Sequence, residues 1–217
     1  MGTDPWKAYL ARFPDPEFGS YARGAISPRL ALELRDHILA APLRPLSPED
    51  RDPAAAWNMI RAGELRRLNE QQRYREPLDD ALAIALLEEL RAPVALAMGT
   101  PWRVLNMRPW TTPPSADMGP CKWHTDGDLH KFAKIMVYLT DCGEGLGGLE
   151  MEAHGAVVTV KGRAGQWCVF RNSVVRHRGM PPAKGERVAV EITIAPADEF
   201  DLQPRFLGHI ARYPLEP

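Results

Sequence analysis

The stretch FAKIMVYLT, residues 132–140, carries the clearest structural pattern in this chain. Ile135, Val137 and Leu139 are apolar and fall on every second position, which is the two-residue period of a β-strand. The intervening side chains form the other face of this strand, beginning with Lys134. A face that mixes charged and apolar residues is expected to be solvated in part, so the pattern predicts a strand with one buried face.

Working outward, the second half of the chain repeats this type of segment. Further short runs of strand composition occupy residues 102–107, 149–152, 157–160, 166–170 and 188–194. Glycines fall between these runs, where turns are expected. Many short strands separated by glycine turns predict a small β-barrel or sandwich.

The first half of the chain has a different pattern. Residues 1–23 are rich in proline and aromatic residues and predict an irregular arm. Ser27 followed by Pro28 is a typical helix start, which predicts a helix to about residue 40. A broad apolar stripe predicts a second helix over about 77–92, which Pro93 should end or kink.

A further helix start is expected at Ser47. Together these segments predict a mainly β protein with a β core braced by N-terminal helices, in one domain over residues 1–217. Its expected parts are a helical support region (1–100), the β core (101–196) and a C-terminal extension (197–217).

Composition limits the classes of function. The 217 residues include 27 Lys and Arg against 28 Asp and Glu, so the formal net charge is -1 and a general affinity for nucleic acid is not expected. Neither a signal segment nor an apolar run of membrane-spanning length is visible. The three cysteines have no paired spacing and are expected to be reduced thiols in the cytoplasm, namely Cys121, Cys142 and Cys168.

A possible metal site begins directly before the central strand, in Trp123-His124-Thr125-Asp126-Gly127. Residues two apart in a strand point to the same side, so His124 and Asp126 can present an imidazole and a carboxylate to one point. A third ligand must come from elsewhere, and His177 lies at the edge of another strand-like segment. Two histidines and a carboxylate are the ligands of a non-haem Fe(II) centre with open coordination positions.

An arginine follows the distal histidine by ten residues. Arg187 opens the last predicted strand, and its forked guanidinium suits a bidentate contact with a carboxylate. Lys134 is a weaker candidate for a second carboxylate anchor, and a solvated strand face is the more ordinary role for it. Taken alone, a His-x-Asp pair or an arginine at a strand start is common, so these residues matter only as a set.

As a set, these residues resemble the Fe(II)/2-oxoglutarate oxygenase superfamily over roughly residues 102–196. The resemblance includes the segments 134–141, 147–150, 162–170 and 177–179. It implies a double-stranded β-helix (jelly-roll, cupin-like) core. It also implies Fe(II) bound by His124, Asp126 and His177, 2-oxoglutarate held by Arg187, with Lys134 as the weaker anchor, and O2 as the oxidant.

The resemblance leaves the branch and the substrate open. The motifs around His124 and His177 look like phytanoyl-CoA dioxygenase relatives, whereas the ten-residue step to Arg187 is closer to prolyl 4-hydroxylase-like enzymes. Either branch implies hydroxylation of a small molecule or of a carrier- or peptide-bound substrate. The alternatives are a cupin-like metal-binding protein without 2-oxoglutarate and a non-catalytic binding module. Arg108, Trp110 and the segment 111–122 are expected at the rim of the pocket, to which Trp123, Arg171, Arg176 and Arg178 would add aromatic and basic character.

Overall fold

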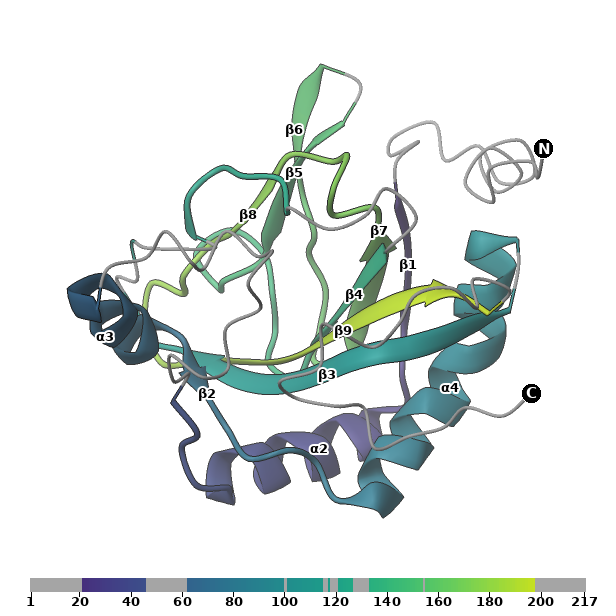
Figure 1. Ribbon diagram of the computed structural model, residues 1–217, viewed down its shortest axis with the longest axis horizontal. Coiled ribbons are helices and arrows are strands. Elements are labelled where there is room, and N and C mark those ends of the chain that lie inside the picture. Colours follow the sequence, from purple (N-terminus) through teal and green to yellow (C-terminus); the bar gives the residue numbers. More distant parts are fainter. Residues whose placement is uncertain are drawn as a thin grey trace.

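The computed structural model describes residues 21–45, 62–99, 101–114, 117, 121–126, 133–153 and 155–197. Their architecture is two antiparallel sheets, the larger of which lies between the smaller sheet and a pair of helices (Figure 1). Two hydrophobic cores result, one on each face of the larger sheet.

The larger sheet has six strands in the order β1-β7-β4-β9-β3-β2. Their bounds are β1 Tyr21–Ala25, β2 Arg73–Tyr74, β3 Trp102–Thr112, β4 Ala133–Tyr138, β7 Gln166–Phe170 and β9 Arg187–Pro196. All of its strand pairs are antiparallel. In the register of the sheet, Val137 of β4 lies between Val190 of β9 and Trp167 of β7.

The smaller sheet has three strands in the order β6-β5-β8. These are β5 Leu149–Ala153, β6 Ala156–Thr159 and β8 His177–Gly179. An isolated antiparallel bridge between His124 and His177 adds a short fourth segment beside β8. The segment that contains the predicted metal ligands is therefore tied to the free edge of the smaller sheet.

In the described part of the first half, three helices precede the β-rich half, α2 Pro28–Ala40, α3 Ala62–Gln71 and α4 Asp80–Met98. The predicted start of α2 is confirmed, because the Ser27 hydroxyl accepts a hydrogen bond from the Leu30 N–H. The Ser27 N–H and hydroxyl both donate to the Glu89 carboxylate, which ties α2 to α4. None of the helices in the described ranges is long and apolar enough to cross a membrane.

The helix predicted over about 77–92 does not end at Pro93, one of the two outcomes expected there. α4 continues through Pro93 and ends at Gly99, which has a left-handed backbone with a φ of 69°. Beyond the proline, Val94, Ala97 and Met98 are buried against the rest of the core. Burial of this last part of the helix outweighs the single backbone hydrogen bond that a proline removes.

The first core lies between the helices and the outer face of the larger sheet. Alternate residues of β4 and β9 face it, as the sequence predicts, with Ile135 and Val137 from β4. The opposite face of β4 is also buried, because it points into the second core between the two sheets. The expectation of a solvated face on this strand is therefore wrong, and Lys134 is only 9% exposed.

Strand β1 is a second correction, because the sequence predicts an irregular arm up to residue 23. Residues 21–25 pair with residues 166–170 of β7 over five positions and form an edge strand of the larger sheet. The sequence of β1 is too short and mixed to show this by itself, since the pairing depends on a partner about 145 residues away. The helix start expected at Ser47 lies outside the described residues.

Truncation of a core leucine on α2 tests this packing. Leu34 is fully buried in the first core, whereas Leu32 of the same helix is 47% exposed. We expect Leu34→Ala to lower the free energy of unfolding by about 2–5 kcal/mol, because it leaves a cavity. The matched control Leu32→Ala should change it by less than about 0.5 kcal/mol. Urea unfolding measures both, and equal effects would contradict this arrangement of α2.

Candidate metal centre

The centre of the candidate site is a cross-strand pair of histidines. The His124 N–H donates to the His177 carbonyl at 2.9 Å, and the His177 N–H donates to the His124 carbonyl at 2.8 Å. Residues paired in this way lie directly opposite each other, with their side chains on the same face. The ring centroids are accordingly 4.4 Å apart. Backbone pairing thus brings together two imidazoles that are 53 positions apart in sequence.

Asp126 joins this pair from two residues further along. Its backbone N–H donates to the Asn172 carbonyl at 3.0 Å, which ties this segment to the turn after β7. Its carboxylate Oδ1 lies 3.4 Å from His124 Nε2, and Oδ2 lies 3.9 Å from His177 Nε2. One ligand atom from each of the three residues lies within 4.8 Å of the others. This is the arrangement that a metal ion bound by three side chains requires.

Backbone carbonyls fix which nitrogen of each imidazole is available. His124 Nδ1 lies 2.7 Å from the Lys122 carbonyl, and His177 Nδ1 lies 2.8 Å from the Val175 carbonyl. A carbonyl can only accept, so each Nδ1 carries the proton and the neutral ring has its lone pair on Nε2. Both Nε2 atoms face the Asp126 carboxylate. Orientation of a ligating histidine by a carbonyl in this way is typical of protein metal sites.

Burial and charge act differently on the three groups. Burial lowers the pKa of His177 to about 4, so its imidazole is neutral. Burial also opposes ionisation of His124, but hydrogen bonds with Asp126 and the Lys122 carbonyl outweigh it and raise the pKa. Burial also opposes ionisation of Asp126, but the charge of Lys134 and a hydrogen bond from His124 in its protonated form outweigh it and hold the pKa of Asp126 well below its usual range. A neutral imidazole and an ionised carboxylate are forms that bind metal ions.

A chain of buried charges extends from Asp126 into the larger sheet. Lys134 Nζ lies 2.5 Å from Asp126 Oδ2 and 3.4 Å from Glu191 Oε2. Arg108 donates to the other oxygen of Glu191. Opposite charges alternate along this chain, in the order Asp126, Lys134, Glu191 and Arg108. Each buried charge therefore has a partner of opposite sign, which is what makes burial of four ionised groups tolerable.

Arg187 lies on the same face of the larger sheet and is 1% exposed. Its guanidinium donates to the Met180 carbonyl at 2.7 Å and to the Thr112 hydroxyl at 2.8 Å, and it lies 5.8 Å from the Trp110 ring. Burial lowers its pKa. Among the described residues no carboxylate forms an ion pair with it, and its Nε has no hydrogen-bond partner. A buried cation with an unused donor can bind an anion.

The structure thus places His124, Asp126 and His177 in one cluster, which Lys134 contacts through Asp126, with Arg187 buried on the same face of the larger sheet as Lys134. Asn172 and Glu191 also belong to the site and were missed in the sequence. Glu191 gave one usable signal, because it is a charged residue in a strand of otherwise apolar character. Asn172 gave none, since only the turn after β7 brings it to Asp126.

Three of the residues expected at the pocket rim lie elsewhere. Arg176 and Arg178 flank His177 in sequence and therefore point to the opposite face of β8. Both pack on the Trp123 ring, at 5.5 and 4.8 Å from its centroid, and both pair with glutamates of β5. This cluster supports the histidine pair from outside.

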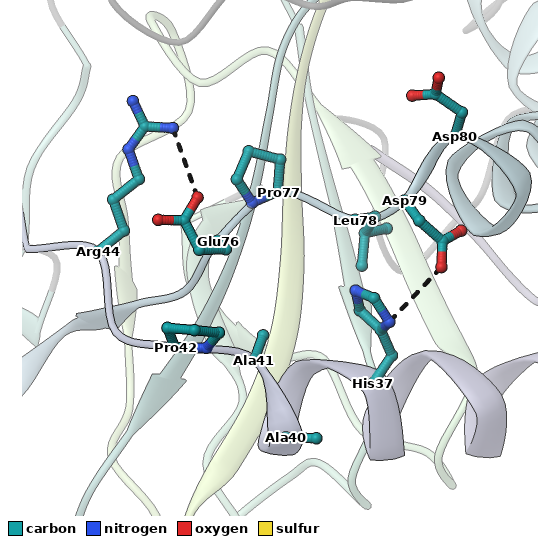
Figure 2. A pocket seen from close by; sticks show the side chains of 10 residues that line it. All are labelled: His37, Ala40, Ala41, Pro42, Arg44, Glu76, Pro77, Leu78, Asp79 and Asp80. Atoms are coloured by element: carbon teal, nitrogen blue, oxygen red, sulfur yellow. Dashed lines mark ion pairs between the residues drawn. The ribbon is translucent and has the colours of Figure 1, made fainter.

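A cavity of about 620 Å³ lies elsewhere, between the end of α2 and the start of α4 (Figure 2). Two ion pairs cross it, His37 with Asp79 at 3.7 Å and Arg44 with Glu76 at 3.9 Å. It is lined by His37, Ala40, Ala41, Pro42, Arg44, Glu76, Pro77, Leu78, Asp79 and Asp80. None of these is a predicted site residue, and exposed ion pairs of this kind contribute little to stability.

Neither a protein-family model nor a curated protein sequence matches this chain. Several solved structures, however, are similar to it. HygX from Streptomyces hygroscopicus, with nickel and 2-oxoglutarate bound, is 13% identical with a TM-score of 0.55, and the match covers 91% of this chain and 89% of HygX. The non-heme alpha-ketoglutarate-dependent carbocyclase SnoK from nogalamycin biosynthesis is 15% identical with a TM-score of 0.59, covering 91% and 85%.

A prolyl-4-hydroxylase from Pseudomonas putida is also similar, at 16% identity and a TM-score of 0.53 over 88% of this chain and 98% of the enzyme. At these identities the likeness is one of fold. The chain has the jelly-roll core of these enzymes, and the predicted double-stranded β-helix is confirmed.

The low pKa of His177 predicts a pH dependence of stability in the metal-free protein. Below its ordinary pKa of 6.5 the unfolded chain binds a proton at His177, whereas the folded chain binds none until about pH 4. Stability therefore falls as the pH is lowered, by up to about 2 kcal/mol from about pH 7.5 to about pH 5. His124, whose pKa is raised, acts in the opposite direction.

The measurement is urea unfolding with a chelator present, for the natural chain and for His177→Gln. His124 is present in both proteins, so the difference between their pH profiles isolates residue 177. Over this range the natural chain should lose more stability than the variant. Parallel profiles would show that His177 binds a proton equally well in the folded and unfolded states.

Proposed function

We propose that this chain is a non-haem Fe(II)- and 2-oxoglutarate-dependent dioxygenase, with His124, Asp126 and His177 as its metal ligands. One observation carries the proposal: two imidazoles with Nε2 available and one ionised carboxylate converge on one point in a jelly-roll fold. Two histidines and one carboxylate form the facial set of non-haem Fe(II) oxygenases. HygX, which has this fold, holds nickel and 2-oxoglutarate in its crystal structure.

The residues present fit the metal. The two Nδ1 atoms are engaged by carbonyls, so the ion would be bound by His124 Nε2, His177 Nε2 and Asp126 Oδ1. The side chains of His124 and Asp126 are 29% and 19% exposed, while that of His177 is 4% exposed. The cluster is therefore supported from the His177 side and open on the other, where co-substrate and substrate could approach.

The residues also fit 2-oxoglutarate. Lys134 and Tyr138 both lie on the face of β4 that points toward the smaller sheet, with Lys134 beside Asp126. Tyr138 is four residues further along the strand, which corresponds to about 13 Å at 3.3 Å per residue. The charge of Arg187 acts on Tyr138, whose buried hydroxyl has no hydrogen-bond partner in the described part of the chain. A five-carbon diacid together with the arginine side chain can span this distance. Arg187 would hold the carboxylate far from the metal, with Tyr138 as a second donor.

When bound, iron with 2-oxoglutarate supplies the oxidation of the substrate by O2, with release of succinate and CO2. The chain's own residues supply placement. The Lys122 and Val175 carbonyls hold the two rings, and Arg187 would fix the direction of the co-substrate. Tyr138, Trp110 and Phe170 are buried on this face of the larger sheet and would exclude water from the surroundings of Arg187.

Hydroxylation of a small molecule, or of a carrier- or peptide-bound substrate, is the reaction we propose. Asp126 supports it, because the superfamily resemblance implies that halogenating relatives carry a small residue in place of the carboxylate. The similar structures include a carbocyclase, an epimerase and a prolyl-4-hydroxylase, so this fold accommodates several outcomes. Product analysis by mass spectrometry on a substrate panel distinguishes them.

An anaerobic Fe(II) titration, followed optically as 2-oxoglutarate is added, tests the proposed function. We expect a weak visible charge-transfer band from iron chelated by the 2-oxo acid. Asp126→Ala should abolish the band, whereas the control Asp36→Ala, at an exposed aspartate of α2, should retain it. Metal binding without a band would support a cupin-like metal protein, and no metal binding would leave the non-catalytic binding module.

Replacing Arg187 tests the co-substrate site. Arg187→Met keeps much of the side-chain volume and removes the charge and its donors, so 2-oxoglutarate should bind on the order of 100-fold more weakly. Binding of Fe(II) alone should be retained. Arg163→Met, at an exposed arginine, is the matched control. An unchanged 2-oxoglutarate affinity in Arg187→Met would assign the anchor to another residue.

A further inference from the structure

We propose that Lys134 and Asn172 are positioning residues that hold one oxygen of Asp126, so that this carboxylate offers a metal ion only its other oxygen. The inference rests on the proposed function, because it concerns how the same centre keeps coordination positions open. It gives Lys134 a role different from that of a second anchor for 2-oxoglutarate.

The two oxygens of Asp126 have different surroundings. Oδ2 accepts hydrogen bonds from Lys134 Nζ at 2.5 Å and from Asn172 Nδ2 at 2.8 Å. Oδ1 is 3.4 Å from His124 Nε2, whereas Oδ2 is 3.9 Å from His177 Nε2. Both donors contact Oδ2, so Oδ1 is the oxygen that they leave available to a metal ion. Rotation of the carboxylate about its Cβ–Cγ bond would break both hydrogen bonds to Oδ2. The two donors therefore select which oxygen points toward the metal position.

Lys134 is itself held at its other side. Its ammonium lies 3.4 Å from Glu191 Oε2, and Glu191 pairs with Arg108. The side chains of Lys134 and Glu191 are only 11% and 5% exposed, so neither can move freely into solvent. A charged donor between two carboxylates is restrained from both sides. Asn172 is fully buried and is placed by the same turn whose carbonyl accepts the Asp126 N–H.

The number of open positions explains why this matters. Two imidazoles and one carboxylate oxygen would take three of six coordination positions and would leave three for a bidentate 2-oxo acid and O2. A carboxylate that binds through both oxygens occupies a fourth position. Bidentate binding by Asp126 would therefore compete with 2-oxoglutarate or with O2. By engaging Oδ2, Lys134 and Asn172 would prevent this competition.

The same contacts argue against Lys134 as a co-substrate anchor. Its ammonium already contacts two carboxylates of its own chain, whereas Arg187 forms no ion pair within the described ranges. An added dicarboxylate gains more from an unpaired cation than from one already neutralised. Lys134 also lies at the metal end of the β4 face, beside a proposed ligand rather than at the far end.

The test uses Co(II) as a spectroscopic probe in the full chain, without and with 2-oxoglutarate. The absorption of bound Co(II) depends on its coordination number and geometry, so it reports on Asp126 before any co-substrate is added. The variant is Lys134→Met, which keeps the length of the side chain and removes its donors. The matched control is Lys161→Met, at an exposed lysine.

We expect Lys134→Met to change the Co(II) spectrum of the 2-oxoglutarate-free protein and to weaken 2-oxoglutarate binding by about tenfold or more. The control should match the natural chain in both measurements. If 2-oxoglutarate binding weakens while the spectrum without it stays unchanged, Lys134 is an anchor and the positioning role is overturned. Unchanged spectrum and unchanged affinity overturn it as well.

Asn172→Ala provides a second, independent variant in case Lys134→Met does not fold. It removes the other donor to Oδ2 without changing a charge, so it should alter the Co(II) spectrum in the same direction. A spectrum identical to that of the natural chain would overturn the inference. Failure of the proposed function is recognised separately, in the natural chain, as Co(II) binding with no response to 2-oxoglutarate.

Discussion

The antiparallel hydrogen-bonded pairing of His124 with His177 is the constraint on which the site depends. It places two distant imidazoles opposite each other on one face, and the alternation of the strand then brings Asp126 to the same side. The pairing is supported from outside, because the Trp123 ring packs against the two arginines that flank His177. Loss of this single bridge would separate His177 from the His124 and Asp126 pair, although all three residues would still be present in the sequence.

Charge is the second determinant of the site. The face of the larger sheet that points toward the smaller sheet carries four ionised residues. Arg108, Glu191 and Lys134 form a row of ion pairs that ends at Asp126, and Arg187 lies apart from this row. Buried charges destabilise a fold unless they are paired, and three of these four have partners within the described residues. Among the described residues, Arg187 is held by neutral acceptors and an aromatic ring and by no carboxylate. This difference is the physical reason for assigning anion binding to Arg187 and positioning to Lys134.

Some elements could be predicted from the sequence and others could not, for identifiable physical reasons. Helix α2 was predictable because its Ser27 cap, Pro28 and apolar stripe are local signals, and β4 and β9 were predictable because alternation is local too. The extension of α4 through Pro93 and the existence of β1 were not, since burial against distant residues decides both. Likewise His124 and Asp126 could be recognised as a pair from their spacing, whereas Asn172 could not be connected with them at all.

By itself, the sequence determined the strand-rich second half, the helices that precede it and the residue types available for a metal and an anion. These follow from periodicity and side-chain chemistry, which act over a few residues. The tertiary structure decided that both faces of β4 are buried and that Lys134 contacts Asp126 and Glu191 instead of water. It also decided which nitrogen of each histidine faces the site. Those outcomes depend on strand register and sheet packing, which join positions far apart in the chain.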